Sequence, residues 1–227
     1  MAYSRGTSNH IIVGAAALFA FEEGDLSDVD LPDLVEGTTY RETLSAAEDS
    51  AAYEQTQLSD DGFRNIGYTM NGLEIVFQPD FGEVQVDQVL DVAKLYKQGM
   101  QVNLNTAFAE STLENLLFAV AGRSEDLDDP ALTGKFAGHS VLNMSAGDIG
   151  ECPVERGLVA VGPGTGNCAI SDEIERIYVA YRALSIENVT VSAKRDEATM
   201  FEVSFRLLPN NAGSYGKVVD RTIPAQS

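Results

Sequence analysis

The chain has few of the residues from which metal and redox sites are built. Its 227 residues include no tryptophan, two histidines and two cysteines. Zinc sites need several closely spaced ligands, and His10, His139, Cys152 and Cys168 are scattered without a Cys-x-x-Cys pair. The sequence therefore predicts no zinc site. The two cysteines are expected to be free thiols, or a single bridge if the protein ends up outside a cell.

Basic residues are also scarce. The chain carries 15 lysines and arginines against 35 aspartates and glutamates, a formal net charge of -20. Proteins that read nucleic-acid sequence contact phosphates through clustered basic residues, and single-strand binding relies on aromatic residues interleaved with basic ones. Neither pattern is present. The composition therefore excludes a sequence-specific nucleic-acid binder.

Long apolar runs are absent, since none approaches the roughly 18 residues that a membrane-spanning helix requires. The longest run, 11–21, continues into Glu-Glu-Gly and not into a small-residue cleavage site. We expect a buried first strand here, and neither a signal peptide nor a membrane segment. Hydrophobic residues make up 44% of the chain, enough for one domain over 1–227 with terminal arms at 1–10 and 209–227.

The motifs of common enzyme classes are incomplete. The glycine-rich segment 161–167 lacks the Gly-Lys-Ser/Thr ending of a phosphate-binding loop. His139 and Ser140 are adjacent, but no Gly-x-Ser-x-Gly elbow is present. The aspartate-rich segments 28–30 and 126–129 lack the glycine and distal glutamate of a calcium loop. The sequence predicts no catalytic residues, no cofactor and no metal, so the protein is expected not to be an enzyme.

Acidic residues are concentrated in segment 22–61. It holds thirteen acidic residues and one basic residue, Arg41, and so carries -12 of the net charge of -20. Its apolar residues are sparse and unperiodic, as in chains that cannot bury enough surface to fold alone. We expect a long acidic loop outside the core, loosely ordered in the free monomer. Loops of this length in compact domains are usually functional or disordered.

The clearest β signal lies at 63–79. Two strand-like runs, 63–70 and 73–79, flank Asn71 and Gly72. An Asn-Gly pair favours a type I′ turn because both central residues need positive φ. The sequence therefore predicts a hairpin at this point.

Alternating residues mark further strands. Val84 and Val86 fall on one face of segment 81–88, and Val102 and Leu104 on one face of segment 100–108. Segment 90–99 is ambiguous between strand and turn. Strands are also expected at 136–144, 158–161, 174–184, 186–194, 199–208 and 218–223. The predicted fold is mainly β, an antiparallel β-sandwich or barrel flanked by one short α-helix, with the long acidic loop between the first strands.

The helix signal lies at 109–122. Ser111 and Glu114 match a capping box, in which each side chain accepts a hydrogen bond from a backbone amide of the first turn. Gly122 follows as a left-handed C-cap. Apolar residues at helical spacing predict one buried stripe, made up of Leu113, Leu116, Leu117 and Val120.

The order of these elements, together with three short motifs, resembles the tail tube (major tail) proteins of tailed bacteriophages. The motifs are Asp-Phe-Gly-Glu-Val-Gln-Val-Asp-Gln at 80–88, the strand at 99–108, and Glu-Ser-Thr-Leu-Glu-Asn-Leu at 110–116. The resemblance covers 11–122, and continues over the last third only as a strand pattern. Similar proteins share this fold with contractile-tail tubes and type VI secretion tube proteins.

The resemblance implies a structural virion protein that forms hexameric rings, stacked into a hollow tail tube. The tube would surround a tape-measure protein and later DNA, which passes without sequence-specific binding. Assembly in the host cytoplasm with tail terminator and baseplate proteins, and with a sheath protein if the tail is contractile, is implied too. Short antiparallel strands with exposed edges suit a ring, because closure pairs the edges.

Three groups of residues are assigned to the expected tube. Strands that join into one barrel turn a polar face to the lumen. The lumen-lining candidates are Glu83, Gln85, Asp87, Gln101, Asn103 and Asn105, and an ordinary solvent face is the alternative. The inter-ring candidates of the acidic loop are Arg41, Glu42, Glu48, Asp49 and Glu54. Their basic partner candidates are Arg64, Lys94, Lys97, Arg123 and Lys135.

Two other classes of function remain open from the residues alone. An acidic DNA mimic that inhibits a nucleic-acid enzyme suits the net charge, although most carboxylates lie in one loop and not along rigid elements. A ligand-binding β-barrel is the other alternative.

Overall fold

The structure, a computed structural model, consists mainly of antiparallel β-strands. It describes residues 14–21, 38–40, 42, 44, 63–85, 87, 91–123, 127–128, 140–144, 152–164, 173–191, 195 and 198–223. These residues form ten strands and one continuous helix, α2 (Leu113–Ala119). The predicted fold class, mainly antiparallel β with one short helix, is confirmed.

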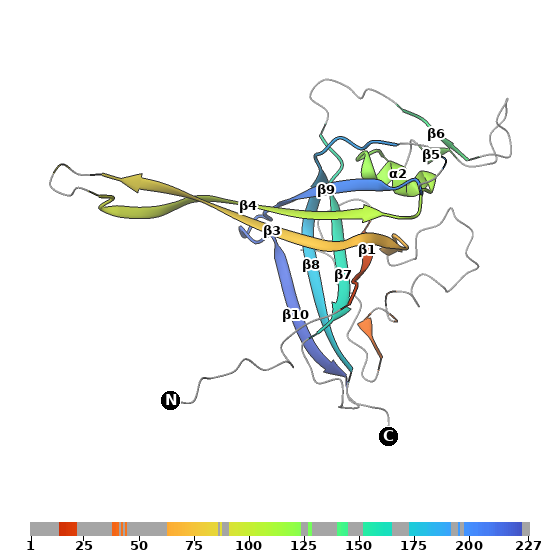
Figure 1. Ribbon diagram of the computed structural model, residues 1–227, viewed down its shortest axis with the longest axis horizontal. Coiled ribbons are helices and arrows are strands. Elements are labelled where there is room, and N and C mark those ends of the chain that lie inside the picture. The colour runs from red at the N-terminus through yellow and green to blue at the C-terminus, as the bar shows by residue number, and fades with distance from the viewer. Residues whose placement is uncertain are drawn as a thin grey trace.

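Eight strands make one antiparallel sheet in the order β2-β1-β7-β8-β9-β4-β3, with β10 also paired to β8. Their bounds are β1 (Ala17–Phe21), β2 (Phe63–Asn65), β3 (Thr69–Val84), β4 (Lys94–Phe108), β7 (Arg156–Pro163), β8 (Glu173–Ser185), β9 (Phe201–Leu208) and β10 (Gly216–Ile223). A two-stranded sheet pairs β5 (Leu127–Asp128) with β6 (Val141–Leu142). In Figure 1, β9, β4 and β3 run across the upper ends of β7, β8 and β10, so the large sheet folds over itself.

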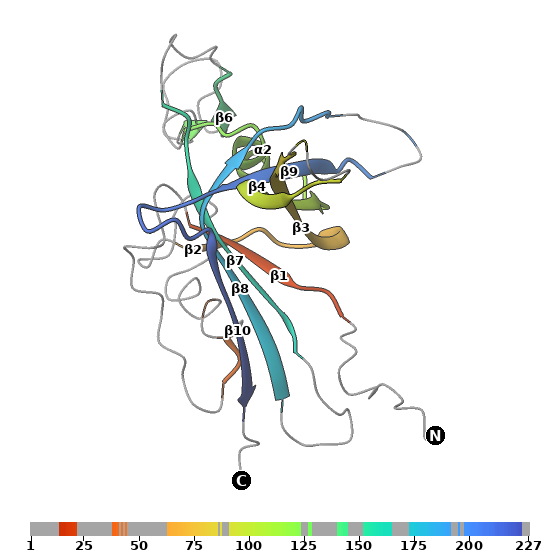
Figure 2. The ribbon, with the colours of Figure 1, turned by 90° about the vertical axis from the view of Figure 1, so that its left-hand side faces the viewer.

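The fold in the sheet occurs at β8, because two different strands pair with the same edge of it. Residues 173–180 of β8 pair with β10, and residues 182–185 pair with β9. Between β9 and β10 the chain leaves the edge of β8. It returns at Tyr215, whose carbonyl accepts a hydrogen bond from Tyr181 N of β8 at 3.1 Å. Figure 2 shows the result: β1, β7, β8 and β10 lie side by side below β9 and β4.

The main core lies between these two halves of the sheet. Leu104 of β4, Phe205 of β9 and Leu158 of β7 are buried in one cluster. Helix α2 closes one side, with the Phe118 and Phe205 rings edge to face and 5.7 Å apart between centroids. The buried Asn115 donates from Nδ2 to the Ile66 carbonyl at 3.0 Å, which ties α2 to the connection between β2 and β3. A helix of seven residues requires such tertiary support.

A second core covers the opposite face of β1, β7 and β8. Phe19, Val159 and Ile177 are buried there against Tyr40 and Leu44 of the acidic segment. Because β1 and β7 are buried on both faces, their sequences are almost continuously apolar. The prediction that segment 22–61 lies outside the core is wrong at its centre, since Tyr40 and Leu44 are only 2% and 0% exposed.

The hairpin predicted at Asn71 and Gly72 is wrong. Both residues have the positive φ that the turn requires, 65° and 74°, but they lie inside β3, which pairs with β4. The register shifts between Met70 and Glu74, so the pair forms a bulge. Thr106 Oγ1 of β4 donates to the Gly72 carbonyl at 3.0 Å across it. Asn71 and Gly72 therefore adopt the backbone conformation that their sequence favours. They do not reverse the chain, because β3 pairs with β4 on both sides of them.

Helix α2 is present, but its ends differ from the prediction. Its N-cap is Thr112, whose Oγ1 accepts from Asn115 N at 3.2 Å, so Thr112 takes the role expected of Ser111. The left-handed residue at the C-terminus is Ala121, with φ 54°, and not Gly122. Gly122 N donates to the Leu117 carbonyl at 2.9 Å, which completes a Schellman motif one residue earlier than expected.

The buried face of α2 is turned relative to the predicted stripe. Leu117 is buried and Leu116 partly buried, as expected. Leu113 and Val120 are 39% and 51% exposed, so their assignment to the core is wrong. The residues that α2 buries are Asn115, Leu117, Phe118 and Ala119. The helix turns this way because Asn115 hydrogen-bonds inside the molecule and Phe118 completes the aromatic cluster.

The other strand predictions have mixed outcomes. The segments 174–184, 199–208 and 218–223 match β8, β9 and β10, and β10 places eight of the 19 residues of the expected C-terminal arm inside the sheet. The strand at 186–194 is wrong, because residues 186–191 carry no strand. The ambiguous segment 90–99 supplies the start of β4. Of segment 136–144, only 140–144 are described, with β6 among them, and the N-terminal arm lies outside the described residues.

Candidate assembly surfaces

The most protruding part of the fold is a two-stranded ribbon, here called the arm, made up of residues 80–84 of β3 and 94–99 of β4. Within the arm the two strands pair only with each other, whereas residues 102–108 of β4 also pair with β9. Figure 1 shows the arm reaching far beyond the rest of the molecule. Both outer edges of the arm therefore present backbone donors and acceptors to which no described strand is paired.

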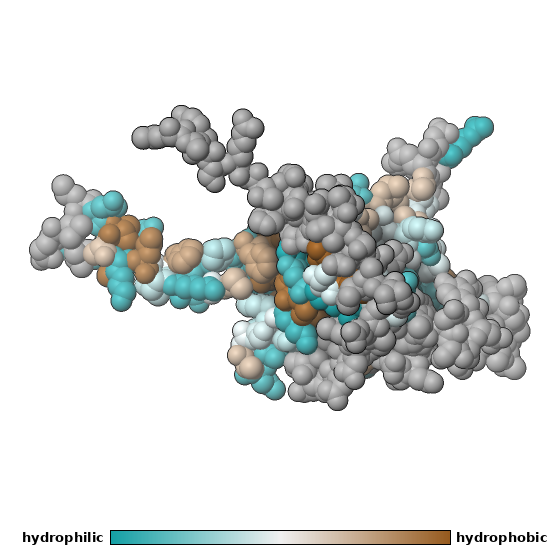
Figure 3. All heavy atoms as spheres, turned by 90° about the horizontal axis from the view of Figure 1, so that it is seen from below, coloured by the Kyte–Doolittle hydropathy of each residue, from teal (hydrophilic) through white to brown (hydrophobic). Residues whose placement is uncertain are grey.

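The arm and its base carry large apolar side chains. Phe77, Phe81 and Leu95 are 60%, 55% and 59% exposed. Phe77 faces Val102 across the ladder, and the alternation of β3 keeps Phe81 and Glu83, the partner of Leu95, on that same face. We call Phe77, Phe81 and Leu95 the arm stripe. Figure 3 shows brown, apolar residues along the arm between hydrophilic ones.

A cleft of about 400 Å³ opens at the base of the arm stripe. Phe77 and Met100 line one side of it, and Tyr178, Tyr215 and Val218 line the other. Tyr215 Oη donates to the Met100 carbonyl at 2.6 Å, which holds the two sides together. The cleft marks the place where the two halves of the sheet do not close, so the apolar surface of the main core continues outward onto the arm.

The opposite face of β3, β4 and β9 is polar. Gln101 donates to Asn103 Oδ1 at 3.2 Å, and Asn105 Oδ1 accepts from Ser204 Oγ at 2.8 Å. The register places further polar residues of β3 and β9 beside them. We call this set the amide face, made up of Glu74, Gln78, Gln101, Asn103, Asn105, Glu202, Ser204 and Arg206. With two acids and one base it carries a formal charge of -1, in a chain of -20.

The structure brings only half of the lumen-lining candidates together. Gln101, Asn103 and Asn105 share the amide face. Glu83 lies on the face of the arm stripe instead, while Gln85 and Asp87 are exposed beyond the end of β3. The expectation that Val84 is buried is also wrong: it is 41% exposed, and no layer formed by the described residues covers the arm. The alternation of residues in one strand shows which side chains share a face of that strand. It does not show which side chains of the neighbouring strand lie on the same face of the sheet.

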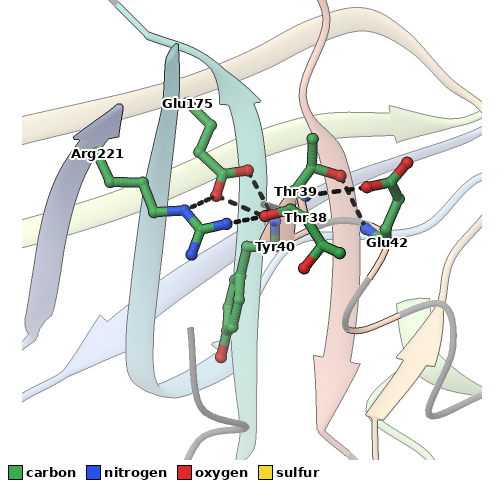
Figure 4. Close-up of polar contacts among 6 residues, drawn as sticks. All are labelled: Thr38, Thr39, Tyr40, Glu42, Glu175 and Arg221. Atoms are coloured by element: carbon green, nitrogen blue, oxygen red, sulfur yellow. Dashed lines mark hydrogen bonds and ion pairs between the residues drawn. The ribbon is translucent and has the colours of Figure 1, made fainter. Parts of the chain in front are cut away.

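On the second core, a buried ion pair anchors the acidic segment (Figure 4). Glu175 of β8 and Arg221 of β10 are cross-strand partners and pair directly. The two carboxylate oxygens of Glu175 accept the Tyr40 N–H at 3.0 and 2.9 Å, and Arg221 Nη2 donates to the Thr38 carbonyl. We call Glu175 and Arg221 the clasp. The sequence offered no signal for it, since Tyr40 and Glu175 are 135 residues apart.

A capping box organises the segment that the clasp holds. Thr39 Oγ1 accepts from Glu42 N at 3.1 Å, and Glu42 Oε2 accepts from Thr39 N at 2.9 Å. The backbone hydrogen bond from Thr39, followed by its side-chain hydrogen bond, lowers the pKa of the Glu42 carboxyl. Glu42, an inter-ring candidate, therefore caps a helical segment that includes Tyr40 and Leu44. The Thr-x-x-Glu pattern at 39–42 is the sequence signal for this turn.

The remaining candidates are dispersed. Those outside the described residues are Arg41, Glu48, Asp49, Glu54 and Lys135. Lys94 and Lys97 are exposed on the arm, and Arg123 is exposed after α2. Arg64 is partly buried, with its guanidinium 5.7 Å from the centre of the Phe118 ring. This cation–π contact commits Arg64 to the core of its own chain, so it is poorly placed as a partner for another subunit.

Comparison with models of known protein families and with curated proteins finds no match to this chain. Among the described residues, no three His, Cys, Asp or Glu side chains are grouped so that they could hold a metal ion. The described part of the chain also contains no helix long and apolar enough to cross a membrane. Cys152 is an exposed free cysteine, and Cys168 lies outside the described residues.

Proposed function

We propose that this protein is a structural virion subunit that assembles into hexameric rings, stacked as the tail tube of a bacteriophage. One observation carries the proposal. The same strands, β3 and β4, present an exposed apolar stripe along edges to which no described strand is paired, and a polar face with few charges on the other side.

The arm supplies the reason for self-assembly. An exposed ribbon with Phe77, Phe81 and Leu95 on one face is an aggregation liability for a lone subunit. In a ring, each subunit covers the stripe of its neighbour, and every copy offers the same pair of surfaces. A head-to-tail contact of this kind closes when the rotation between copies fits the ring. The cleft at the base of the arm extends the apolar surface that the neighbour covers.

The amide face is the surface that we assign to the lumen. Gln101, Asn103 and Asn105 provide hydrogen-bonding groups without net charge. A basic lining would bind DNA phosphates through counterion release, and a strongly acidic lining would repel them. A lining rich in amides and with few charges therefore suits a channel through which DNA slides without sequence-specific binding.

The remaining partners follow from the same assignment. The acidic segment is proposed to contact adjacent subunits, with the exposed Lys94 and Lys97 of the arm as basic partners. A tape-measure protein inside the tube, terminator and baseplate proteins at its ends, and a sheath if the tail is contractile complete the proposed virion tail, assembled in the host cytoplasm.

Electron microscopy of the purified protein tests the proposal. We expect rings or tubes with a central channel, and a protein that stays monomeric at all concentrations would contradict it. The double variant Phe81→Ser with Leu95→Ser should remain a folded monomer without rings, because both side chains are already exposed in the subunit. Val191→Ser, at a residue 54% exposed outside the arm, is the matched control and should assemble normally.

A second experiment tests the lumen assignment. Lysine at positions 101 and 103, through Gln101→Lys and Asn103→Lys, adds two positive charges to the amide face. Tubes should still form, while DNA ejection from particles that contain the variant slows because the lysines bind phosphates. An unchanged ejection rate in intact tubes would mean that the amide face does not line the channel.

A further inference from the structure

We propose that the cleft at the base of the arm binds a single-chain fatty carboxylate, with its hydrocarbon chain between the two halves of the sheet and its carboxylate at Lys97. The inference goes beyond the proposed function and concerns the free subunit, so it holds whether or not rings form. The sequence alone gave no indication of this site, because its walls come from strands far apart in the chain.

The cleft extends from the main core to the surface. Three of its lining residues, Val102, Leu104 and Leu158, are only 1–2% exposed and belong to the main core. Two others, Phe77 and Val218, are 60% and 58% exposed. Its volume of about 400 Å³ lies near the lower end of the roughly 300–1,000 Å³ that is typical of ligand pockets. That size suits one hydrocarbon chain and not the two chains of a membrane lipid.

Two of the hydroxyl groups that line the cleft are already bonded within the chain. Tyr215 Oη donates to the Met100 carbonyl at 2.6 Å, and Ser214 Oγ donates to the Gly216 carbonyl at 3.2 Å. A sugar or a nucleotide requires several hydrogen-bonding groups that are still open, because its polar atoms lose their bonds to water on binding. An apolar chain requires none. The lining therefore favours a ligand that is mainly hydrocarbon.

The charge of the cleft is positive, although the chain as a whole is strongly acidic. Of the charged residues, Lys97 and Lys217 line the cleft, and no described aspartate or glutamate does. Alternation along β10 places Lys217 on the face of Val219, which packs against the second core. Lys97 is opposite Phe81, on the face of the arm stripe. Lys97 is therefore the cation that faces the cleft.

The ammonium group of Lys97 is available to a carboxylate. Its Nζ lies 3.6 Å from Met100 Sδ, the hydrogen bond that it makes among the described residues. A thioether sulfur is a weak acceptor, and an ammonium has three donors. A carboxylate at the mouth of the cleft would replace this weak contact by a charge-assisted hydrogen bond. One cation beside an apolar cleft thus matches one monoanionic head group on one chain.

Calorimetric titration of the wild-type protein with sodium dodecanoate, below the concentration at which it forms micelles, tests the site. We expect one dodecanoate bound per chain. Decanoate should bind about 15-fold more weakly, because each buried methylene contributes about a fourfold factor in affinity. The absence of saturable binding, or equal affinities for the two chain lengths, would overturn the inference.

A charge variant tests the position of the carboxylate. Lys97→Gln should bind dodecanoate about fivefold more weakly than the wild type, as expected for an exposed ion pair. Its affinity for dodecan-1-ol, which has no charge, should be unchanged. Lys94→Gln is the matched control, because Lys94 is exposed on the opposite face of the same strand and should not affect either ligand. Equal affinities of the wild type and Lys97→Gln for dodecanoate would overturn the assignment of the head group.

A second pair of variants tests the position of the chain. Val218→Trp should abolish binding because the indole fills the cleft, and the protein should still fold because Val218 is exposed. Val191→Trp, at an exposed residue outside the cleft, should bind normally. The double variant Phe81→Ser with Leu95→Ser should also bind, since neither residue lines the cleft. Binding that survives Val218→Trp but is lost in this double variant would place the ligand on the arm and overturn the inference.

The two proposals fail independently. A protein that forms rings but does not bind dodecanoate would overturn the fatty carboxylate site and leave the proposed function standing. A protein that binds dodecanoate in the cleft but stays monomeric at all concentrations would overturn the proposed function and leave the site standing.

Discussion

Two regions of the large sheet differ in whether their apolar side chains are covered. On β1, β7 and β8, Phe19 and Ile177 are sealed by Tyr40 and Leu44 of the same chain, and the adjacent charges of the clasp are paired. On the arm, Phe81 and Leu95 stay exposed. The apolar side chains of the second core are thus covered within one chain, whereas those of the arm are covered by a second chain only in the proposed tube.

The difference arises from what lies opposite each strand. β1 and β7 have sheet neighbours on both edges and cover on both faces. The arm strands have one neighbour each and, in the described part of the chain, no covering layer. A phenylalanine at position 19 therefore stabilises the subunit, whereas one at position 81 contributes little to it and would stabilise the proposed assembly. Each prediction below tests one side of this comparison against the other.

The largest effect is expected for Phe19→Ala. Phe19 is fully buried in the second core, so its truncation should lower the free energy of unfolding by about 3–5 kcal/mol. Phe81→Ala should change the stability of the monomer by less than about 1 kcal/mol, since Phe81 is already 55% exposed. Urea unfolding of both monomers measures the contrast. Equal losses would show that the arm is part of the subunit's own core.

The next largest effect is expected at the clasp. Glu175→Gln leaves the buried charge of Arg221 without its counter-ion and should cost about 3 kcal/mol in chemical unfolding. Glu155→Gln is the matched control, because Glu155 and Arg182 form a similar pair at 2.6 Å whose side chains are more exposed. That change should cost less than about 1 kcal/mol. Similar losses at both sites would mean that burial does not distinguish the two pairs.

A smaller contrast is expected within α2. Leu117→Ala should lower the free energy of unfolding by about 2–3 kcal/mol, near the low end for a buried leucine because α2 lies at the side of the core. Leu113→Ala should cost less than about 1 kcal/mol, because Leu113 is largely outside the core. Thermal melts of the two variants compare them directly. A larger loss of stability for Leu113→Ala than for Leu117→Ala would support the buried stripe predicted from the sequence.

The smallest effect is expected at Arg176 and Asp220, which pair at 2.6 Å across β8 and β10 in a partly exposed position. The hydrogen bond from Arg176 lowers the pKa of the Asp220 carboxyl. A carboxyl whose pKa is lowered in the folded state stabilises the fold above its unfolded value of about 3.9, and this contribution is lost as pH falls through the folded pKa.

Melting curves of the wild type and Asp220→Asn measure this contribution. The difference should be less than about 1 kcal/mol, constant between about pH 8 and pH 5, and lost toward about pH 2. It should also shrink as salt screens the pair. A difference that persists at the lowest pH would show that packing, and not charge, accounts for the effect of Asp220.

Many elements of the fold were predictable because their signals are local. The period-two pattern of Val102 and Leu104 placed β4 and its amide face, and the last three strands were found within a few residues. The helix was found as well. The errors occur where the same local signal fits two outcomes: Asn71 and Gly72 adopt positive φ in a bulge as readily as in a hairpin.

The chain's composition and periodicity by themselves determined an acidic, mainly β protein with one short helix, because strand alternation, turn chemistry and net charge depend on neighbouring residues. Only the tertiary structure decided which strand β3 pairs with, which face α2 buries, and that Tyr40 docks on Glu175. These outcomes depend on packing between segments far apart in the chain. Whether Tyr40 is buried and Phe81 exposed depends on the surface that lies opposite each side chain, and not on the residue type alone.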